Sequence, residues 1–177
     1  MDILNKEDLD TRLESVGKNC VLGLAAVTLF KNQEAWKLLE NTDLEVGNYR
    51  VDLNRVVKQL KNNKKGGAIE EYIKMLFRAL LKESYELVKD YCKDTRQMNL
   101  LKSENWYHFA RIIRNCLSHD FRIVLSKQDK SILPVSWNNH TISADMDGQD
   151  LDLNFFSFCD AIELIDDIQI FSKKRLA

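Results

Sequence analysis

The sequence predicts an all-α protein, a helical bundle with one small β-hairpin inserted before the last helix. Three observations support this fold class. The chain of 177 residues contains one proline and six glycines, which is too few for the many tight turns of a sandwich or a barrel and favours long helices. Apolar residues recur every three or four positions over most of the chain, which is the helical repeat. Only the stretch after Asp120 departs from that repeat, and we expect the hairpin there.

The overall composition is typical of a soluble globular protein, with 45% hydrophobic and 30% charged residues. The length suits one domain with its own core, so we expect residues 1–177 to form a single domain. No apolar run approaches the roughly 20 residues that span a bilayer, and the acidic start "MDILNKEDLD" lacks the apolar segment of a signal peptide. The cysteines, at positions 20, 92, 116 and 159, form no C-x-x-C pair and lie in apolar stretches. We therefore expect a cytoplasmic protein with reduced, buried thiols.

The first 65 residues are expected to form N-terminal helices. Between about 9 and 39, apolar residues at helical spacing predict one long helix or two helices bent near Gly23. The stretch "NTDLEVGNYR" (41–50) is interpreted as a loop, and "DLNRVVKQLK" (52–61) as a short helix capped by Asp52 or Asn54. The polar run "NNKKGG" (62–67) would end that helix.

Residues 66–172 carry the clearest patterns. A strongly amphipathic helix is expected over about 68–96, and a second from near Ser103 to the end of the motif described below. A hairpin is expected at about 131–145, with Asn138-Asn139 as its turn and Pro134 on an edge strand. The last helix, about 154–172, is expected to bury Phe155, Phe158, Ile162, Ile165 and Ile168.

Charge is distributed unevenly along the chain. Residues 50–128 hold 17 basic and 9 acidic side chains, a net charge of +8, whereas residues 129–171 hold 1 basic and 9 acidic, a net of −8. One interpretation is a basic face that attracts an anionic partner. The other is that the two segments pair with each other and are otherwise solvated. The sequence leaves both open.

The most distinctive stretch is "FARIIRNCLSHDF" (109–121), an amphipathic helix whose end is crowded with polar side chains. Each residue of a helix advances about 100°, so Asn115 and His119 share a face while Arg114 and His119 are about 140° apart. Arg114 and His119 can therefore converge only if the helix distorts near its end or if the arginine side chain wraps around it.

Three chemical interpretations of this stretch fit poorly. Adjacent residues point in different directions, so Ser118, His119 and Asp120 cannot form a Ser-His-Asp triad. A metal-dependent phosphohydrolase built on His119 and Asp120 needs further ligands, and only His108 and His140 remain to supply histidine. Zinc held by Cys116 and His119 lacks a second Cys/His pair.

A fourth interpretation fits better. The run Arg114-Asn115-Cys116-Leu117-Ser118-His119 resembles the Arg-polar-x-x-x-His signature of the HEPN superfamily, the higher-eukaryote and prokaryote nucleotide-binding domains. The resemblance extends to the preceding "ENWYHFARII", to the helical layout and to the hairpin before the last helix. Together these features cover most of residues 66–172, which we therefore expect to form a HEPN-like core.

The resemblance implies a metal-independent endoribonuclease that works as a homodimer, with two copies of the motif facing each other across the subunit interface. It implies no cofactor and no metal. The 2′-hydroxyl of RNA would attack the phosphate and leave a 2′,3′-cyclic phosphate. The arginine fork of Arg114 would hold the scissile phosphate, and His119 would exchange protons near neutral pH. Asn115 would orient the histidine or hold a phosphate oxygen. These three residues are the candidate catalytic residues.

Three neighbours of the motif are candidate substrate-binding residues. Arg111 lies one turn before Asn115 and is either a ligand of flanking phosphates or a solvated helix arginine. Asp120 would pair with His119, or else with Arg122 or Lys127. Ser118 is the third candidate. Bacterial members of the superfamily are commonly toxins of toxin–antitoxin or phage-defence systems, so the resemblance also implies RNA and an antitoxin or regulatory protein as partners.

Two alternatives stay open. The superfamily includes non-catalytic modules that bind a nucleotide, RNA or a protein, and a metal-dependent phosphohydrolase is the third possibility. The environment of Arg114 separates the first two. An active dimer needs Arg114 and His119 in a solvent-open cleft, whereas an Arg114 held in a buried ion pair within its own subunit would remove the main support for the enzyme.

Overall fold

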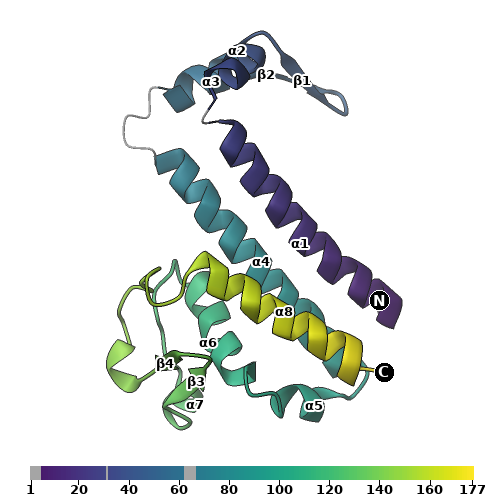
Figure 1. The fold of residues 1–177 in the computed structure, drawn as a ribbon, viewed down its shortest axis with the longest axis vertical. Coiled ribbons are helices and arrows are strands. Elements are labelled where there is room, and N and C mark those ends of the chain that lie inside the picture. The colour runs from purple at the N-terminus through teal and green to yellow at the C-terminus, as the bar shows by residue number, and fades with distance from the viewer. Residues whose placement is uncertain (1–4, 31, 62–66) are drawn as a thin grey trace. The chain divides into compact units, whose positions relative to one another are not determined.

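The computed structural model of the chain describes residues 5–30, 32–61 and 67–177. The described part is mainly α-helical, which confirms the predicted class, and it contains two small antiparallel strand pairs. It divides into two compact units, a larger one formed by the chain up to Lys18 with Phe77–Ala177, and a smaller one formed by Asn19–Leu76. The expectation of a single domain stays a prediction. The helices, shown in Figure 1, are α1 Lys6–Leu29, α2 Gln33–Glu40, α3 Leu53–Lys61, α4 Gly67–Asp94, α5 Met98–Lys102, α6 Tyr107–Ser118, α7 Lys127–Lys130 and α8 Phe158–Arg175.

The core of the larger unit is rich in aromatic rings. Phe109 of α6 is fully buried and its ring centroid lies 5.5 Å from that of Trp137 and 5.6 Å from that of Phe156. Trp106 packs edge-on against Phe171 of α8 at 5.7 Å. These contacts join α6 to α8 and to the hairpin, and they hold the helix that carries the Arg-x-x-x-x-His motif.

The predicted hairpin before the last helix is confirmed, but Pro134, which was expected on an edge strand, precedes the first strand and is not part of it. Strands β3 (Val135–Trp137) and β4 (His140–Ile142) are antiparallel, and Asn138, with φ of 47°, makes the turn between them. Three side chains of this hairpin contact acidic residues of α8. Trp137 Nε1 donates to Asp167 at 2.8 Å, and Asn138 donates to Glu163 at 3.3 Å. His140 Nε2 lies 3.1 Å from Asp160. The hairpin therefore fixes the start of α8.

Helix α8 begins later than predicted, at Phe158 in place of about Asn154. A capping box formed by Ser157 and Asp160 starts the helix, whereas the amide N–H of Asn154 donates to the side chain of Asp152 in a turn that precedes it. Of the five residues expected to be buried, Ile165 and Ile168 are buried, but Ile162 is 45% exposed and was wrongly assigned to the core. The buried stripe of α8 includes Ala161 and Leu164 beside Ile165 and Ile168, and Ile162 lies outside it.

Helix α1 runs through Gly23 without interruption, so of the two arrangements considered for this region the chain forms two helices, α1 and α2, but without a bend at Gly23. The helix ends at Leu29, and Asn32 caps α2 by accepting from the N–H of Glu34 at 2.9 Å. Gly23 serves close packing instead. A Cβ placed there would lie 2.5 Å from a methyl group of Leu76 on α4.

The stretch "NTDLEVGNYR" is a hairpin, contrary to the loop that was expected. Strand β1 (Asp43–Val46) pairs with β2 (Tyr49–Asp52), and Gly47, at a φ of 59°, lies in the two-residue turn. The pattern was visible in the alternation of apolar and polar residues on both sides of Gly47-Asn48. As predicted, Asp52 caps α3, since it accepts from the N–H of Arg55 at 3.3 Å. The "NNKKGG" run lies outside the described residues except for its last glycine.

No single helix in the described ranges is both long and apolar enough to cross a membrane, although α1 and α2 taken together pass the same test of length and composition. The expectation of buried thiols holds for Cys20, Cys92 and Cys116, but Cys159, at the start of α8, is exposed.

Candidate functional site

The candidate motif lies at the C-terminal end of α6. The apolar face of this helix is buried, including Phe109, Ile113, Cys116 and Leu117 at 0% exposure. His119 is the residue that ends the helix, with a φ of −107° and a ψ of 40°, and its backbone N–H donates to the carbonyl oxygens of Asn115 (3.1 Å) and Cys116 (3.0 Å). The buried apolar face thus holds α6 in place, and the motif residues lie on its polar side, at the C-terminal end.

Arg114 is held by an acidic residue that the sequence did not single out. Its guanidinium forms an ion pair with Glu86 of α4, and Lys89 pairs with the other carboxylate oxygen of Glu86 at 2.7 Å. The side chains of Arg114 and Glu86 are 25% and 24% exposed. The two side chains are partly exposed, but the pairing oxygen Oε1 of Glu86 and Nε of Arg114 are themselves buried, so this ion pair within one subunit favours the non-catalytic alternative over the enzyme.

The same guanidinium also reaches sideways along its own helix. Nη1 of Arg114 donates to the side-chain oxygen of Asn115 at 2.9 Å. Because Asn115 and His119 lie on one face of the helix, this contact directs the arginine toward the side of the helix where His119 lies. The helix ends at Ser118, and the guanidinium of Arg114 contacts Asn115 and Glu86; among the described residues it makes no contact with His119.

His119 itself is exposed. In the part of the chain that the structure describes, its imidazole has no hydrogen-bond or ion-pair partner within the protein. Ser118 is also exposed, and its hydroxyl donates to the carbonyl oxygen of Arg114 at 3.2 Å. The imidazole is thus open to solvent and to any molecule that binds at this end of α6.

The chain turns sharply directly after His119. Asp120 and Phe121 both adopt the left-handed conformation, with φ values of 56° and 62°, which costs on the order of 1 kcal/mol for each non-glycine residue. Burial of the Phe121 ring stabilises this turn, since the ring packs against Phe77 at 6.0 Å and beneath the guanidinium of Arg78 at 5.5 Å. Strain of this kind is concentrated at functional sites.

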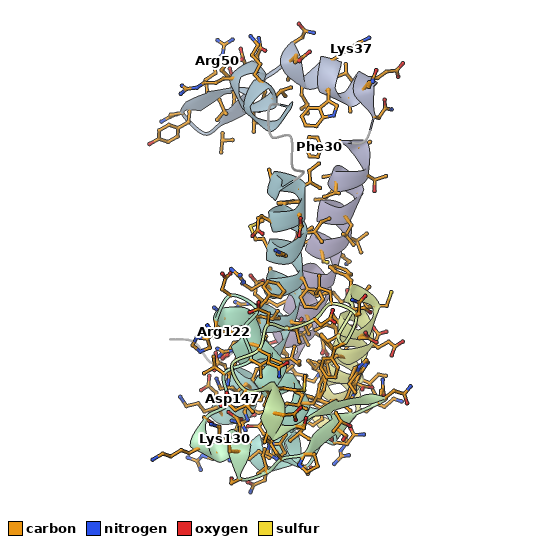
Figure 2. The ribbon with its side chains drawn as sticks, turned by 90° about the vertical axis from the view of Figure 1, so that its left-hand side faces the viewer. Phe30, Lys37, Arg50, Arg122, Lys130 and Asp147 are labelled. Carbon is orange, nitrogen blue, oxygen red and sulfur yellow. The ribbon has the colours of Figure 1, made fainter. Side chains whose placement is uncertain are left out.

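Asp120 pairs with none of the partners considered from the sequence. Its carboxylate is 96% exposed and lies 3.3 Å from Arg78 of α4. Arg122, which was one candidate partner, instead donates to the carbonyl oxygen of Gly148 at 2.8 Å. The loop that follows is held to the same region by Lys130, which lies 2.7 Å from Asp147 (Figure 2). The turn after His119 is therefore anchored at both ends.

Arg111 has a structural partner. Its guanidinium lies 2.5 Å from the carboxylate of Asp129, which is only 1% exposed. Asp129 also accepts from the backbone N–H of Ser126 at 2.8 Å, in the capping box of α7. Arg111 is 15% exposed, so of the two alternatives for this residue the solvated helix arginine is wrong. It connects α6 to α7 beneath the motif.

These ion pairs bear on the two interpretations of charge. Arg111 pairs with Asp129 of the acidic segment, whereas Arg114 and Arg78 pair with acidic residues of the basic segment itself. The positive charge nearest the motif is therefore largely balanced within the protein. Of these three ion pairs, only Arg111–Asp129 joins the basic segment to the acidic one, so these pairs leave most of the net +8 of residues 50–128 in place.

Cysteine and metal chemistry find little support around α6. Burial raises the pKa of the Cys116 thiol to about 12, so this thiol is protonated at neutral pH and is not a ready nucleophile. Among the described residues, no three histidine, cysteine, aspartate or glutamate side chains converge as a metal site would require. His140 lies in the hairpin beside Asp160, and His108 is half-buried, with its pKa lowered by burial and by Arg111.

Sequence reasoning missed Glu86 and Asp129, the acidic partners of the two arginines. Glu86 lies 28 positions before Arg114, on a helix with several other acidic residues, and no pattern distinguishes it from them. Asp129 had a local signal, because Ser126 followed three residues later by an acid is a capping box. Only the packing of α4 and α7 against α6 shows which acids are involved.

Comparisons with known proteins return no match, since no family model, no curated protein and no solved structure is significantly similar to this chain.

Proposed function

We propose that this protein is a metal-independent endoribonuclease of the HEPN type, with Arg114, Asn115 and His119 as its catalytic residues. One observation carries the proposal. At the end of α6, Arg114 is bonded to Asn115, while the imidazole of His119, on the same face as Asn115, is open to solvent. A guanidinium binds a phosphate group, and an accessible imidazole gives or takes a proton near neutral pH. Both functions would therefore lie at the end of α6.

The residue types suit the cleavage of RNA. The 2′-hydroxyl of RNA is an internal nucleophile, so the protein has to remove a proton, stabilise the charge that develops on the phosphate and protonate the leaving 5′-oxygen. His119 would exchange protons, and Arg114 would stabilise the negative charge on the non-bridging oxygens. The products would be a 2′,3′-cyclic phosphate and a free 5′-hydroxyl. No metal-bound water is needed in this scheme.

Glu86 would act as a positioning residue in this proposal. An arginine held by a carboxylate on a neighbouring helix has a fixed orientation, and the loss of side-chain entropy on binding phosphate is correspondingly smaller. The same carboxylate lowers the local positive potential. A second copy of the chain would add a second Arg114 to the site and restore that potential, so we propose that the active form is a homodimer with the motifs at its interface.

The biological setting is part of the proposal. Such an enzyme would act on RNA in the cytoplasm, as a toxin or a phage-defence component, and would be controlled by an antitoxin or another regulatory protein. Arg111, Ser118 and Asp120 would lie beside the bound RNA. Of these, Ser118 and Asp120 are exposed, whereas the charge of Arg111 is already balanced by Asp129.

A second candidate is a non-catalytic module that binds a nucleotide, RNA or a protein. The ion pair between Arg114 and Glu86 favours it, because a phosphate has to compete with a carboxylate that is already in place.

The test is RNA cleavage in EDTA by the unaltered protein and by His119→Asn and Arg114→Ala. We expect each substitution to lower the rate by roughly a hundredfold or more, and the products to carry 2′,3′-cyclic phosphate ends. Arg12→Ala serves as the control, since Arg12 is an exposed arginine of α1. Circular dichroism and sedimentation of each variant verify folding and oligomeric state.

The other outcomes point to the alternatives. Cleavage only with added divalent metal would replace the proposal by a phosphohydrolase built on His119 and Asp120. Cleavage that survives both substitutions would assign the activity elsewhere. If no RNA is cut but RNA binds and Arg114→Ala weakens that binding, the binding module is correct.

A further inference from the structure

One face of α4 runs along the end of α6 that carries the motif. Arg78, Lys82 and Glu86 are spaced four residues apart, so they share this face, and each is about 6 Å from the next along the helix axis. At one end of the face, Arg78 lies 3.3 Å from Asp120 in the turn that follows the motif. At the other end, Glu86 pairs with Arg114. Lys82 therefore lies midway between these two contacts, beside the motif.

Lys82 differs from the neighbouring cations in having no carboxylate partner. The other cationic side chains of α4 and α6 around the motif are each paired with an acidic residue, namely Arg78 with Asp120, Lys89 and Arg114 with Glu86, and Arg111 with Asp129. Lys82 is exposed, and among the described residues no hydrogen bond or ion pair holds its ammonium group. Its acidic neighbour in sequence, Glu83, projects about 100° away around the helix. The ammonium group of Lys82 is thus an unbalanced positive charge beside the motif.

A phosphate group is the ligand that suits this position. A lysine ammonium on its flexible four-carbon stem binds phosphate as a point charge. Of the neighbours that the sequence indicated for substrate binding, Arg111 is neutralised by Asp129, and Asp120 is itself acidic. Neither therefore offers a phosphate an unpaired positive charge. An RNA strand with one phosphate at Arg114 has its next phosphate one nucleotide away, within reach of a lysine side chain that lies one helical turn from Glu86 along α4.

We propose that Lys82 binds an RNA phosphate next to the one held by Arg114. The identity of the ligand as RNA rests on the proposed function. Lys82 thereby takes the role of binding flanking phosphates that the sequence suggested for Arg111. The flanking phosphate does not react, so Lys82 contacts it equally in the ground state and in the transition state. Such a contact contributes to binding and leaves the rate of the chemical step unchanged.

Binding is measured with a short single-stranded 2′-O-methyl RNA in EDTA. This probe lacks the free 2′-hydroxyl, so its binding is observed without cleavage. Each phosphate that a cation of the protein neutralises contributes about 0.7 to the slope of log affinity against log salt concentration for a single strand. We therefore expect Lys82→Gln to reduce the magnitude of this slope by about 0.7 and to weaken binding at low salt by roughly threefold or more.

Two further variants serve as controls. Lys82→Arg keeps the charge at this position and should bind the probe as the parent does. Lys174→Gln removes an equal charge from the exposed end of α8. That end lies near Ala177, whose N–H donates at 3.1 Å to Gln97, just beyond α4, and the end of α4 is about 18 Å from Lys82 along the helix axis. Lys174→Gln should therefore leave both the affinity and the slope nearly unchanged.

Cleavage of ordinary RNA separates this proposal from the proposed function. In an active ribonuclease, Lys82→Gln should raise KM and leave kcat within about twofold, whereas His119→Asn lowers kcat. A parent that binds the probe through Lys82 but cuts no RNA contradicts the ribonuclease and supports the phosphate site.

Three results would overturn the assignment of Lys82. The first is that Lys82→Gln binds the probe with the affinity and the salt slope of the parent, even where the parent cleaves RNA. The second is that Lys174→Gln weakens binding as much as Lys82→Gln does, because the effect would then be one of total charge. The third is that the parent does not bind the probe, including the case in which a polyglutamate peptide binds in its place.

Discussion

The two units of this protein bury their apolar residues to very different extents. Nine of the fourteen large hydrophobic side chains that are exposed in the described residues belong to the smaller unit, Asn19–Leu76, although it is only a third of the chain. These nine are Val21, Leu22, Leu29, Leu38, Leu44, Val46, Tyr49, Val51 and Met75. In the larger unit most large apolar residues of α4, α6 and α8 are buried. Regularly spaced apolar residues occur in both units, but they are mostly buried in the larger unit and often exposed in the smaller one.

The difference in burial follows from the number of neighbouring elements that each helix packs against. In the larger unit α6 is surrounded by α4, α8 and the β3–β4 hairpin, and aromatic rings fill the space between them. Apart from the end of α1 and the start of α4, the smaller unit has short elements, since α2 spans 8 residues and each strand 4. Short elements cannot surround a core by themselves.

The largest expected effect tests the packed unit. Phe109→Ala removes a fully buried ring that contacts Trp137 and Phe156, and it should lower the free energy of unfolding by about 3–5 kcal/mol. Leu38→Ala, which removes a side chain that is 72% exposed in the smaller unit, should change it by less than about 0.5 kcal/mol. Urea denaturation followed by circular dichroism compares the two. Similar losses in both variants would mean that the smaller unit is packed as tightly as the larger one.

A smaller effect concerns how the stability of the larger unit depends on pH through Asp160, which lies beside the β3–β4 hairpin. Burial by itself raises the pKa of Asp160, but hydrogen bonds from Ser157 and His140 outweigh burial and hold the pKa below its ordinary value of 3.8. The folded state therefore gains stability from the ionised carboxylate above that ordinary value, and this gain is lost as the pH falls through the lowered pKa. Asp160→Asn should cost about 1 kcal/mol at neutral pH.

The stability difference between the parent and Asp160→Asn should then shrink as the pH is lowered from 5 toward 2, in urea titrations at each pH. A difference that stays constant over this range would show that the ionised carboxylate of Asp160 does not stabilise the start of α8.

The smallest effect compares the two units along one helix. A Cβ at Gly17, in the part of α1 that belongs to the larger unit, meets nothing within 4 Å, whereas a Cβ at Gly23 lies 2.5 Å from a methyl group of Leu76. Gly17→Ala should therefore stabilise the protein by about 0.5–1 kcal/mol through helix propensity alone. Gly23→Ala should destabilise it by about 1 kcal/mol, because Leu76 has to move. Thermal unfolding of both variants measures the difference, and stabilisation by Gly23→Ala would show that α1 and α4 are not closely packed there.

Sequence patterns predicted most of the larger unit. The helix near 68–96, the hairpin turn at Asn138-Asn139 and the burial of Trp106 follow from local periodicity and turn residues, and each is present in the structure. The helix expected from near Ser103 is also present but begins at Tyr107. The boundaries were less accurate, because Ser157 and not Asn154 caps the last helix. The β1–β2 hairpin was missed since its residues are exposed, although the alternation around Gly47-Asn48 contained the signal.

For the candidate site, too, part was predictable from the sequence and part depended on the packing of the helices. The sequence by itself determined which residues crowd the end of α6, because Arg114, Asn115 and His119 lie within six consecutive positions and helical geometry relates them. Only the tertiary structure decided that Glu86 holds Arg114, that Asp129 holds Arg111 and that His119 is left open. The physical reason is that an ion pair depends on distance in space. Helix packing brought these acids to the two arginines, and no local pattern encodes which of the many acidic residues will be the one in reach.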